Sequence, residues 1–299
     1  MKETKDIKIF DWLKYRMAFV ILSLVVILAG LGNLAINGVA LGVDFTGGSL
    51  VEYHFDQEIS TEAATKTIVS LFVSLASIQK TGTSSYLFKL APIERKQAEQ
   101  IQEALKKEFG GDVREDRFEN VGPSVGAELI KKTIYALLLA TLGILCWIAY
   151  QFKSFRFGIA ATVATLHDAI IIIGTYSIVS RLYHAEIDFL FVTAVLTILS
   201  FSVHDTIIVF DRIREIRRKH GGEMHTVVNR AISETMRRSI FNSLAIIFML
   251  LSLVILGGTT TRWFAVALLI GTVSGTYSSP FIAAPLLAFL YRKELVKTS

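Results

Sequence analysis

The chain has 299 residues, of which 52% are hydrophobic and 19% are charged, and its mean hydropathy is +0.51. Soluble domains carry about 25% charged residues, so this composition excludes an ordinary soluble globular protein and indicates a membrane protein. The net charge of +5 would also suit nucleic-acid binding, but the basic residues gather between long apolar runs, as in membrane topology, so no nucleic-acid partner is expected.

Six apolar segments are candidates for transmembrane helices. They cover residues 17–36, 134–150, 157–179, 189–210, 240–256 and 263–290. A helix needs about 20 residues to cross the hydrocarbon core, so the second and fifth segments must include flanking residues. The first segment is longer than the hydrophobic region of a signal peptide and lacks a clear cleavage site, so we interpret it as a retained first helix.

Lysine and arginine residues indicate the orientation of these helices. They cluster in both terminal tails and in the second-to-third and fourth-to-fifth connections, whereas the other two short loops carry only Arg181 and Arg262. By the positive-inside rule, both termini are expected in the cytoplasm. The predicted division is a tail over 1–16, a helix over 17–36, an extracytoplasmic domain over 37–132, five helices within 133–290 and a tail over 291–299.

The segment after the first helix is soluble in composition. Strands are predicted over 49–55, 77–81, 84–90 and 113–121, and helices over 61–75 and 93–109. The order βαββαβ is typical of a ferredoxin-like sandwich with helices on one sheet face. The predicted fold class is therefore an α-helical polytopic membrane protein with six transmembrane helices. An extracytoplasmic α+β ferredoxin-like domain is expected between the first and second helices.

Two acidic residues lie inside predicted membrane helices. Asp205 interrupts the fourth apolar segment, and Asp168 lies near the middle of the third. A carboxylate at that depth costs about 2.5–3.5 kcal/mol, so an intramembrane acid is a functional candidate by default. Arg238, just before the fifth segment, is a candidate charge partner for Asp205.

Polar residues repeat at helical spacing around both acids. In the fourth segment they lie on one stripe, at Thr193, Thr197, Ser200 and His204, adjoining Asp205. In the third segment a similar stripe holds Thr165, Asp168 and Thr175, with His167 beside it. Lipid cannot satisfy such groups, so each stripe is expected to face other helices or water. Two facing stripes with His–Asp pairs would form a hydrated proton path.

Structural explanations stay open for each of these residues. Asp205 lies about 8 Å of helix rise from Phe210 and could simply reach a cytoplasmic vestibule. Asp168 could make a structural hydrogen bond or ion pair. Arg238 could extend its side chain to the inner lipid headgroups. The two histidines, taken alone, are as typical of helix packing.

The sequence predicts no metal site and no cofactor. It contains no HExxH motif, and the members of each His–Asp pair are adjacent, so they point about 100° apart on a helix. The glycines in VDFTGG, Gly47 and Gly48, are not followed by Gly-Lys-Ser/Thr, so a turn into the first strand is a simpler account than a phosphate loop. The only cysteine, Cys146, excludes an intrachain disulfide.

Several stretches together resemble one family, the protein translocase subunit SecF. They are LGVDFTGGSLVEY at 41–53, VGPSVGAEL at 121–129, LHDAIII at 166–172, LTILSFSVHDTIIVFDRIRE at 196–215, TMRRS at 235–239 and FAVALLIGTVSGTYSSPFIAAPLL at 264–287. The resemblance covers nearly the whole chain in the same order. It implies a six-helix half-transporter related to the resistance-nodulation-division exporters, in a bacterial cytoplasmic membrane.

The resemblance also implies a mechanism and partners. The partner would be SecD, and the complex would use proton flow to help preproteins finish crossing through SecYEG after SecA-driven entry. Unfolded exported polypeptide and membrane lipids would be further contacts, and the family also admits YajC and YidC. In the family pattern, the relay acid maps to Asp205 and the relay arginine to Arg238, while Asp44, Gly47 and Gly48 belong to an extracytoplasmic motif.

The sequence departs from the family pattern at two places. His204 stands where the family usually has Asn before the relay acid, which adds a titratable group. The stretch FNSLA after Ser239 differs from the usual Thr/Ser/Gly-rich pattern, and Arg237 is a second candidate for the relay arginine. Whether the coupled ion is a proton or sodium stays open at this point.

We therefore predict a proton-coupled subunit of a protein-export complex, with Asp205 as proton carrier, Arg238 as charge partner, and Asp168 and His204 as supporting polar groups. It is not expected to be an enzyme. The alternative is a stand-alone exporter of small molecules or lipids, for which two similar six-helix halves or a homo-oligomer would be expected. An intramembrane hydrolase ranks last, because no nucleophile–base or metal motif is recognisable.

Overall fold

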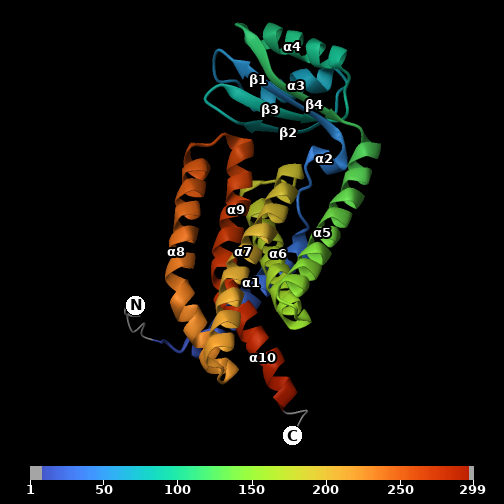
Figure 1. Ribbon diagram of the computed structural model, residues 1–299. Helices are drawn as coiled ribbons and strands as arrows, with labels where there is room; N and C mark the ends of the chain where they lie inside the picture. The colour runs from blue at the N-terminus through green and yellow to red at the C-terminus, as the bar shows by residue number, and fades with distance from the viewer. Residues whose placement is uncertain (1–8, 296–299) are drawn as a thin grey trace.

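The computed structural model describes residues 9–295, without the side chains of residues 123, 259, 260 and 292–295. Long helices stand side by side below a small layer of strands and helices (Figure 1). Six helices in the described part are long and apolar enough to cross a membrane. They are α1 (Arg16–Asn37), α5 (Pro123–Gln151), α6 (Phe155–Tyr183), α7 (Phe189–His220), α8 (Met224–Leu256) and a last span that begins with α9 (Thr259–Ser278). The predicted six-helix membrane fold is confirmed.

Most of these helices extend beyond the apolar segments that predicted them. The fifth predicted segment covers 240–256, whereas α8 begins at Met224; α7 likewise continues to His220. The extensions are polar, so hydropathy alone does not detect them, and they are helical because they pack against each other through ion pairs and apolar side chains. The predicted tails, 1–16 and 291–299, fall partly outside the described residues.

The last span changes its helical geometry near its C-terminal end. A turn of π-helix, η2 (Ser279–Ala283), separates α9 from α10 (Ala284–Leu295), and Pro280 lies in its first turn. Proline has no backbone N–H and its ring obstructs the preceding turn, so the ladder of hydrogen bonds must be rearranged here. The side chains of Ser278 and Ser279 in this region point into the bundle and are buried.

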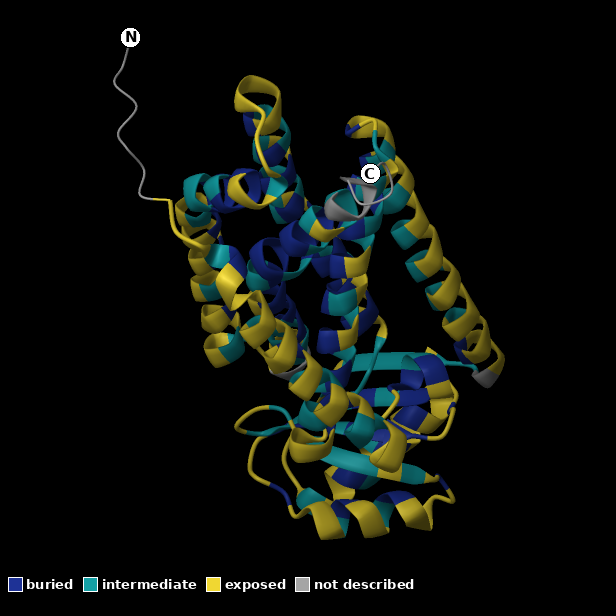
Figure 2. Cartoon of the chain, turned by 90° about the horizontal axis from the view of Figure 1, so that it is seen from below, coloured by how far each residue is buried: buried dark blue, intermediate teal, exposed yellow. Residues whose placement is uncertain are grey.

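The helices form an inner group and an outer group. Spans α6, α7 and α9 are the most buried, whereas α1, α5 and α8 carry many exposed apolar side chains. Figure 2 shows buried residues concentrated in the middle of the bundle and exposed residues on its outer helices. An outer apolar surface is expected where helices meet lipid or a partner helix, because neither requires polar side chains.

Helix α1 approaches α6 closely through glycines. A Cβ atom on Gly30 would lie 2.5 Å from the backbone of Gly174, so neither helix could come so near with a larger residue there. The Ser177 hydroxyl donates to the Gly30 carbonyl over 3.0 Å. Small residues and interhelical hydrogen bonds of this kind are the usual means of association between membrane helices.

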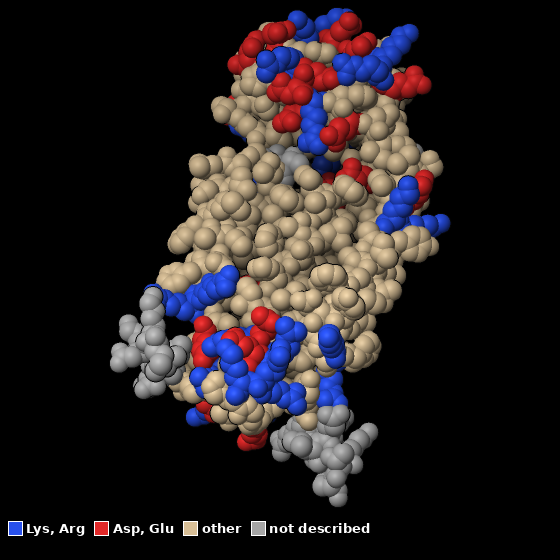
Figure 3. Space-filling model, in the orientation of Figure 1, with Lys and Arg blue, Asp and Glu red and all other residues tan. Residues whose placement is uncertain are grey.

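Charged residues gather at the two ends of the molecule, with an apolar belt between them (Figure 3). Basic residues predominate at the end that carries the α7–α8 turn, where Arg217, Arg218 and Lys219 close α7. The belt and the six spans agree with a multi-pass membrane protein.

The extracytoplasmic layer contains a four-stranded antiparallel sheet. Its strands are β1 (Gly48–Phe55), β2 (Leu75–Lys80), β3 (Ser85–Leu90) and β4 (Val113–Val121), in the order β2-β3-β1-β4. Helices α3 (Thr61–Ser70) and α4 (Arg95–Phe109) cover the sheet face that points away from the membrane helices (Figure 1). This is the predicted ferredoxin-like arrangement, and the structure confirms it.

Alternation along the strands determines which sheet face is covered. On β1, Val51, Tyr53 and Phe55 are buried beneath the helices, together with Phe88 of β3 and Ile101 of α4. Intervening residues such as Glu52 point to the opposite face. Period-two burial of large apolar side chains fixes the register, because a shift of one residue would expose all of them.

Helix α3 is shorter than predicted. It ends at Ser70 rather than near residue 75, and Phe72 adopts a left-handed conformation with φ +59° and a fully exposed side chain. The early end allows Val73 to reach the core and β2 to begin at Leu75. Apolar residues in 71–75 favoured helix by pattern, but the sheet required an extended chain.

Candidate functional site

Asp205 lies on α7 and is half-buried. Its Oδ2 atom accepts a hydrogen bond of 2.9 Å from the hydroxyl of Ser239 on α8, so the acid joins two transmembrane helices. A cavity of about 340 Å³ lies beside it. The cavity is lined from α7, α8 and α9 by Phe201, Ser202, His204, Asp205, Asn242, Ser243, Ala245, Ile246, Gly271, Thr272, Gly275 and Thr276. The acid therefore has polar neighbours and open space, which a group that exchanges a proton requires.

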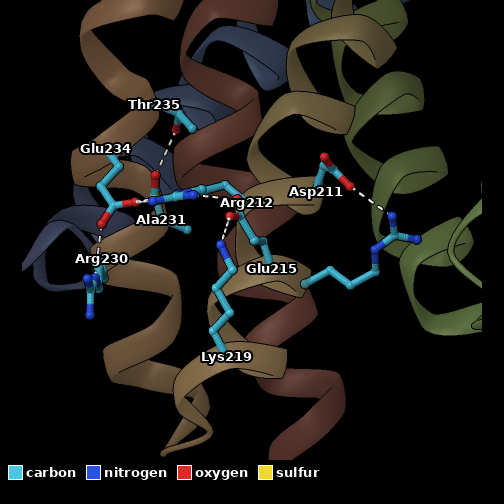
Figure 4. A network of polar contacts seen from close by, with 9 residues as sticks. Asp211, Arg212, Glu215, Lys219, Arg230, Ala231, Glu234 and Thr235 are labelled. Carbon is cyan, nitrogen blue, oxygen red and sulfur yellow. Dashed lines mark hydrogen bonds and ion pairs between the residues drawn. The ribbon is translucent and has the colours of Figure 1, made fainter. Parts of the chain in front are cut away.

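An ion-pair network holds α7 and α8 together about two helical turns from Asp205, toward the α7–α8 turn (Figure 4). Arg212 of α7 pairs with Glu215 on its own helix and with Glu234 of α8. Arg230 also reaches Glu234, with 2.9 Å between Nε and Oε1, and Lys219 reaches Glu215 over 2.7 Å. These pairs fix the register of the two helices, and this register places Ser239 opposite Asp205.

Asp168 has a different environment from Asp205. It lies on α6, is 0% exposed, and both of its oxygens accept two hydrogen bonds. Oδ2 accepts from Ser202 of α7 at 2.5 Å and from Ser278 of α9 at 2.7 Å. Oδ1 lies 2.5 Å from the Ser274 hydroxyl and 3.0 Å from His167 Nδ1. One carboxylate thus connects the three inner helices.

The two acids lie near the same cavity. Ser202, which donates to Asp168, also lines the cavity, and it precedes Asp205 by three residues on α7. A Cβ atom on Gly275 would lie 3.5 Å from Ser202 Cβ and 3.9 Å from Asp168 Oδ2. A side chain at position 275 would therefore contact both Ser202 and Asp168, and the glycine leaves this space at the cavity wall without a side chain.

The predicted polar stripe on the fourth helix does not face the rest of this chain. Thr193, Ser200 and His204 are exposed, and the Thr193 and Thr197 hydroxyls donate to backbone carbonyls one turn earlier. The inner face of α7 instead carries Ser202 and Thr206, both buried. The two stripes therefore do not face each other: Asp168 meets the side of α7 opposite the predicted stripe.

Arg238 is exposed and makes no hydrogen bond or ion pair with Asp205 in the described part of the chain. Its neighbour Arg237 places its guanidinium 5.6 Å from the centre of the Phe241 ring. The residue that contacts Asp205 is Ser239, which directly follows Arg238. His204 is exposed at the edge of the cavity.

The extracytoplasmic motif forms a tight junction between α1 and β1. Asp44 lies on a single helical turn, α2 (Val43–Thr46), which Gly47 ends with φ +74°. Gly48 has φ +141°, and a Cβ atom there would lie 2.8 Å from the Leu90 carbonyl oxygen. Both glycines are needed because left-handed backbone and this close approach exclude other residues. The predicted turn into the first strand is present.

Asp44 also reaches the helix that carries Asp205. Its Oδ2 atom accepts a 2.8 Å hydrogen bond from the backbone N–H of Phe189, the first residue of α7. Asp188, the N-cap of α7, accepts from the Phe191 N–H over 2.8 Å. Burial raises the pKa of the Asp188 carboxyl, and the nearby Asp44 charge adds to this. The backbone of residues 40–42 pairs with Ile187, which completes the contact.

A second link joins the sheet to the same loop. Lys89 of β3 is 7% exposed and pairs with Glu186, two residues before the N-cap of α7. The extracytoplasmic layer therefore contacts the start of α7 through Asp44 and Lys89. A movement of α7 would therefore be transmitted directly to the sheet.

The serines that bind Asp168 were not predicted from the sequence. Ser202 lies outside the predicted stripe. Ser274 and Ser278 lie in a segment that was interpreted from its glycines and prolines alone. A usable signal existed: Ser274 and Ser278 are four residues apart, so they share one face of α9. Asp188 was also missed, although an aspartate directly before an apolar helix is a typical N-cap.

The described residues contain no cluster of three or more His, Cys, Asp or Glu side chains that could hold a metal ion. The cavity beside Asp205 carries the hydroxyls of Ser202, Ser243, Thr272 and Thr276 among apolar neighbours.

Family models match most of the chain. A model described as "Protein export membrane protein SecD/SecF, C-terminal" matches residues 100–293, and a model described as "SecD/SecF GG Motif" matches residues 33–59. The second match includes Asp44, Gly47 and Gly48.

Several curated proteins match nearly the whole length of this chain. The protein translocase subunit SecF of Thermobaculum terrenum is 39% identical over 304 residues, which cover 96% of each chain. SecF of Anaerolinea thermophila is 37% identical over 282 residues, or 90% of each chain. The protein translocase subunit SecDF of Bacillus subtilis is 32% identical over 97% of this chain and 39% of its own length.

The fold also matches a solved structure. The crystal structure of SecDF from Thermus thermophilus, a translocon-associated membrane protein, superposes with a TM-score of 0.82 and 27% identity. The match covers 97% of this chain and 40% of that one, so this chain corresponds to less than half of that SecDF protein. The chain belongs to the SecF family of Sec-pathway protein translocase subunits, as a multi-pass membrane protein.

Proposed function

We propose that this chain is the SecF subunit of a SecDF complex and uses the proton motive force to assist late steps of preprotein translocation through SecYEG. The observation that carries this proposal is the position of Asp205, a half-buried acid that bridges α7 and α8 beside a cavity of about 340 Å³. An acid in such a place can gain a proton from one side of the membrane and release it to the other only if the helices rearrange.

The electrochemical gradient supplies adequate energy for this task. One charge that crosses 100 mV releases about 2.3 kcal/mol, which is enough to bias two conformations of a helix pair. Ionised Asp205 accepts the Ser239 hydrogen bond, whereas the protonated acid loses its charge and becomes a donor as well. The contact between α7 and α8 therefore differs in the two states, and this difference couples the proton to helix position.

The start of α7 carries the change to the extracytoplasmic layer. Asp44 binds the first N–H of α7, and Lys89 binds the preceding loop, so a shift of α7 moves the sheet. Arg238 is the proposed charge partner of Asp205 in another stage of the cycle, because it adjoins Ser239 and is free to reorient from an exposed position. His204, at the edge of the cavity, adds a titratable group beside the acid.

The proposed assembly includes a SecD-type partner. This chain corresponds to 40% of the Thermus SecDF chain, and the remainder of that chain is the basis for the proposed SecD-type partner. The outward face of α7 carries Ser200 and His204, which supports a partner helix at this face, since lipid offers these side chains no hydrogen-bond partner. We place both termini in the cytoplasm and the sheet outside the bacterial cytoplasmic membrane, as the basic loops indicate.

The proposal is tested by replacing Asp205 with Asn in the complex with SecD, reconstituted with the SecYEG channel in vesicles. Preprotein release under an imposed proton gradient should fall to the level measured without a gradient. Asp211→Asn is the matched control, because Asp211 lies on the same helix, is exposed, and pairs only with Arg214 among the described residues. Undiminished stimulation in a correctly inserted Asp205→Asn variant would refute the role of the acid.

A sodium gradient of equal size provides a second arm of the experiment. Stimulation by protons and not by sodium is expected. Purification in mild detergent checks the partner: recovery of SecD supports the proposal, whereas self-association alone would favour a stand-alone exporter.

A further inference from the structure

A second ionisable pair lies in the membrane bundle, on the far side of Ser202 from the cavity. His167 is 11% exposed, and its Nδ1 atom lies 3.0 Å from Asp168 Oδ1. The other ring nitrogen, Nε2, is buried and has no hydrogen-bond partner. Its ring meets Tyr277 of α9 edge-on, with 5.9 Å between the ring centres, and the Tyr277 hydroxyl is engaged with Ser23 of α1.

The contacts of Asp168 indicate an ionised carboxylate. A carboxylate only accepts hydrogen bonds and has about four lone-pair positions, and four donors surround Asp168: three serine hydroxyls and His167. A proton on the acid would compete with one of these donors. The charged form is therefore the one that the surrounding groups satisfy.

An ionised Asp168 determines which nitrogen of His167 carries hydrogen. Nδ1 must donate to the carboxylate, so Nε2 of a neutral ring is an acceptor that receives nothing. The pair then holds one uncompensated negative charge in the bundle, because His167 is the only basic side chain paired with Asp168 in the described residues. A buried charge without a partner is costly, and a proton on Nε2 converts the pair to a neutral one.

We propose that His167 and Asp168 form a second proton-binding site, in which His167 takes up the proton and Asp168 balances its charge. This inference rests on the proposed function, because the site would serve the same ion. The ligand is a proton rather than a metal cation, since the four contacts of Asp168 are already filled by donors.

The ionisable groups around the site are few. On neighbouring helices they are Tyr277 of α9 and the adjoining Asp205 and His204 of α7. Helix α1 carries no charged residue after Arg16, and the charged residues of α5 lie before residue 133, at its extracytoplasmic end. Tyr291 of α10 packs against Phe157, more than two helical turns away along α6. Among the described residues, no Lys or Arg side chain is paired with His167 or Asp168.

The new site is coupled to Asp205 through a short path. Ser202 donates to Asp168 and lines the cavity that holds Asp205. A negative charge on Asp205 favours the cationic form of His167, and a proton on His167 favours the ionised form of Asp205. Proton loss at one site would thus be linked to proton uptake at the other.

The test is a pH titration of the histidine ring nitrogens by ¹⁵N NMR, in the full chain with its SecD partner in bilayers. The chain has six histidines, so the His167 signal is assigned by its loss in His167→Gln. We expect this signal to change over the pH range of the titration, because Nε2 gains a proton as the pH falls. Asp205→Asn should move its midpoint to lower pH, because the attractive negative charge is removed, whereas the control Asp211→Asn should leave it in place.

A His167 ring whose nitrogen shifts stay constant over this pH range would overturn the proposal. An equal midpoint in the wild type and Asp205→Asn would overturn the coupling. The titration does not depend on transport, so it separates the two proposals. If gradient-driven release requires Asp205 but the His167 signal does not change with pH, this inference alone is refuted. If the His167 signal changes with pH but release is normal in Asp205→Asn, the proposed function alone is refuted.

Discussion

Asp205 and Asp168 are the same residue type in adjacent membrane helices, yet they have opposite surroundings. Asp205 is half-buried, accepts one hydrogen bond from another helix and adjoins a cavity. Asp168 is fully buried and surrounded by four donors: three serines from two other helices, α7 and α9, and its own neighbour His167. Depth in an apolar segment therefore does not by itself indicate the role of an acid. The number of hydrogen-bond donors around the acid and the open space beside it indicate its role.

The largest expected difference between the two acids is in stability. Asp168→Ala removes a carboxylate that connects α6, α7 and α9, and leaves three serines and His167 without their acceptor. Unfolding free energy should fall by about 3–5 kcal/mol, as for a broken buried pair. Asp205→Ala loses one hydrogen bond, worth about 1 kcal/mol.

Reversible unfolding in mixed detergent micelles would measure both variants, with the exposed Asp211→Ala as control. If Asp205→Ala lost as much unfolding free energy as Asp168→Ala, the predicted difference would be wrong, because both acids would then be structural.

Two glycines that line the cavity, Gly271 and Gly275, allow a sharper comparison. A Cβ atom on Gly271 would lie 2.6 Å from Ile198 and 2.8 Å from Ile172, whereas one on Gly275 meets nothing nearer than 3.5 Å. Gly271→Ala should cost about 1–3 kcal/mol through overpacking, and Gly275→Ala should lie within about 0.5 kcal/mol of the wild type. The same unfolding assay measures both.

Gly275→Ala also adds a methyl group between the cavity and Asp168. If the two acids communicate through this gap, the shift of the His167 midpoint caused by Asp205→Asn should change in this background. An unchanged shift would place the communication elsewhere.

The smallest expected effect concerns a third carboxylate, Asp188, at the extracytoplasmic end of α7. Burial raises its folded pKa above the ordinary value of 3.8. A raised folded pKa contributes stability that is present below the unfolded pKa and is lost as pH rises through the folded pKa. Asp188→Asn keeps a capping side chain but has no carboxyl group to ionise. The loss of stability with rising pH that comes from this residue should therefore disappear.

The measurement is the free energy of unfolding of the wild type and Asp188→Asn over acidic pH. Asp112→Asn is a control of opposite sign, because Lys106 lowers the pKa of the exposed Asp112, so its contribution is lost as pH falls. Parallel pH profiles for the wild type and Asp188→Asn would contradict the prediction.

Much of the fold was predictable from residue pattern. Apolar length located the six spans, and alternation with turn residues located the four strands, because both reflect burial that repeats along the chain. Helix ends were less accessible to the sequence. The polar start of α8 is helical because Glu234 and Arg230 join the α7 network, and α3 stops at Ser70 because Val73 enters the core.

The candidate site was only partly predictable. Asp205, Asp168, Asp44 and the glycine pair stood out because each is costly or constrained where it lies. Their partners did not, because a serine has no distinctive pattern in a membrane helix and donates to whatever acceptor lies opposite. The polar stripe on the fourth helix was recognised, but the face of α7 that packs inward carries Ser202 and Thr206 instead.

By itself, the sequence determined the membrane class, the number of spans, the ferredoxin-like layer and the presence of two acids at membrane depth. These follow from composition and from periodicities of 2 and 3.6 residues, which are local properties of the chain. Only the tertiary structure decided that Ser239 binds Asp205, that three serines and His167 enclose Asp168, and that Asp44 holds the first turn of α7. Apart from the adjacent His167–Asp168 pair, those contacts join residues 34 to 145 positions apart. Their geometry depends on helix rotation and register, which packing sets and no local pattern encodes.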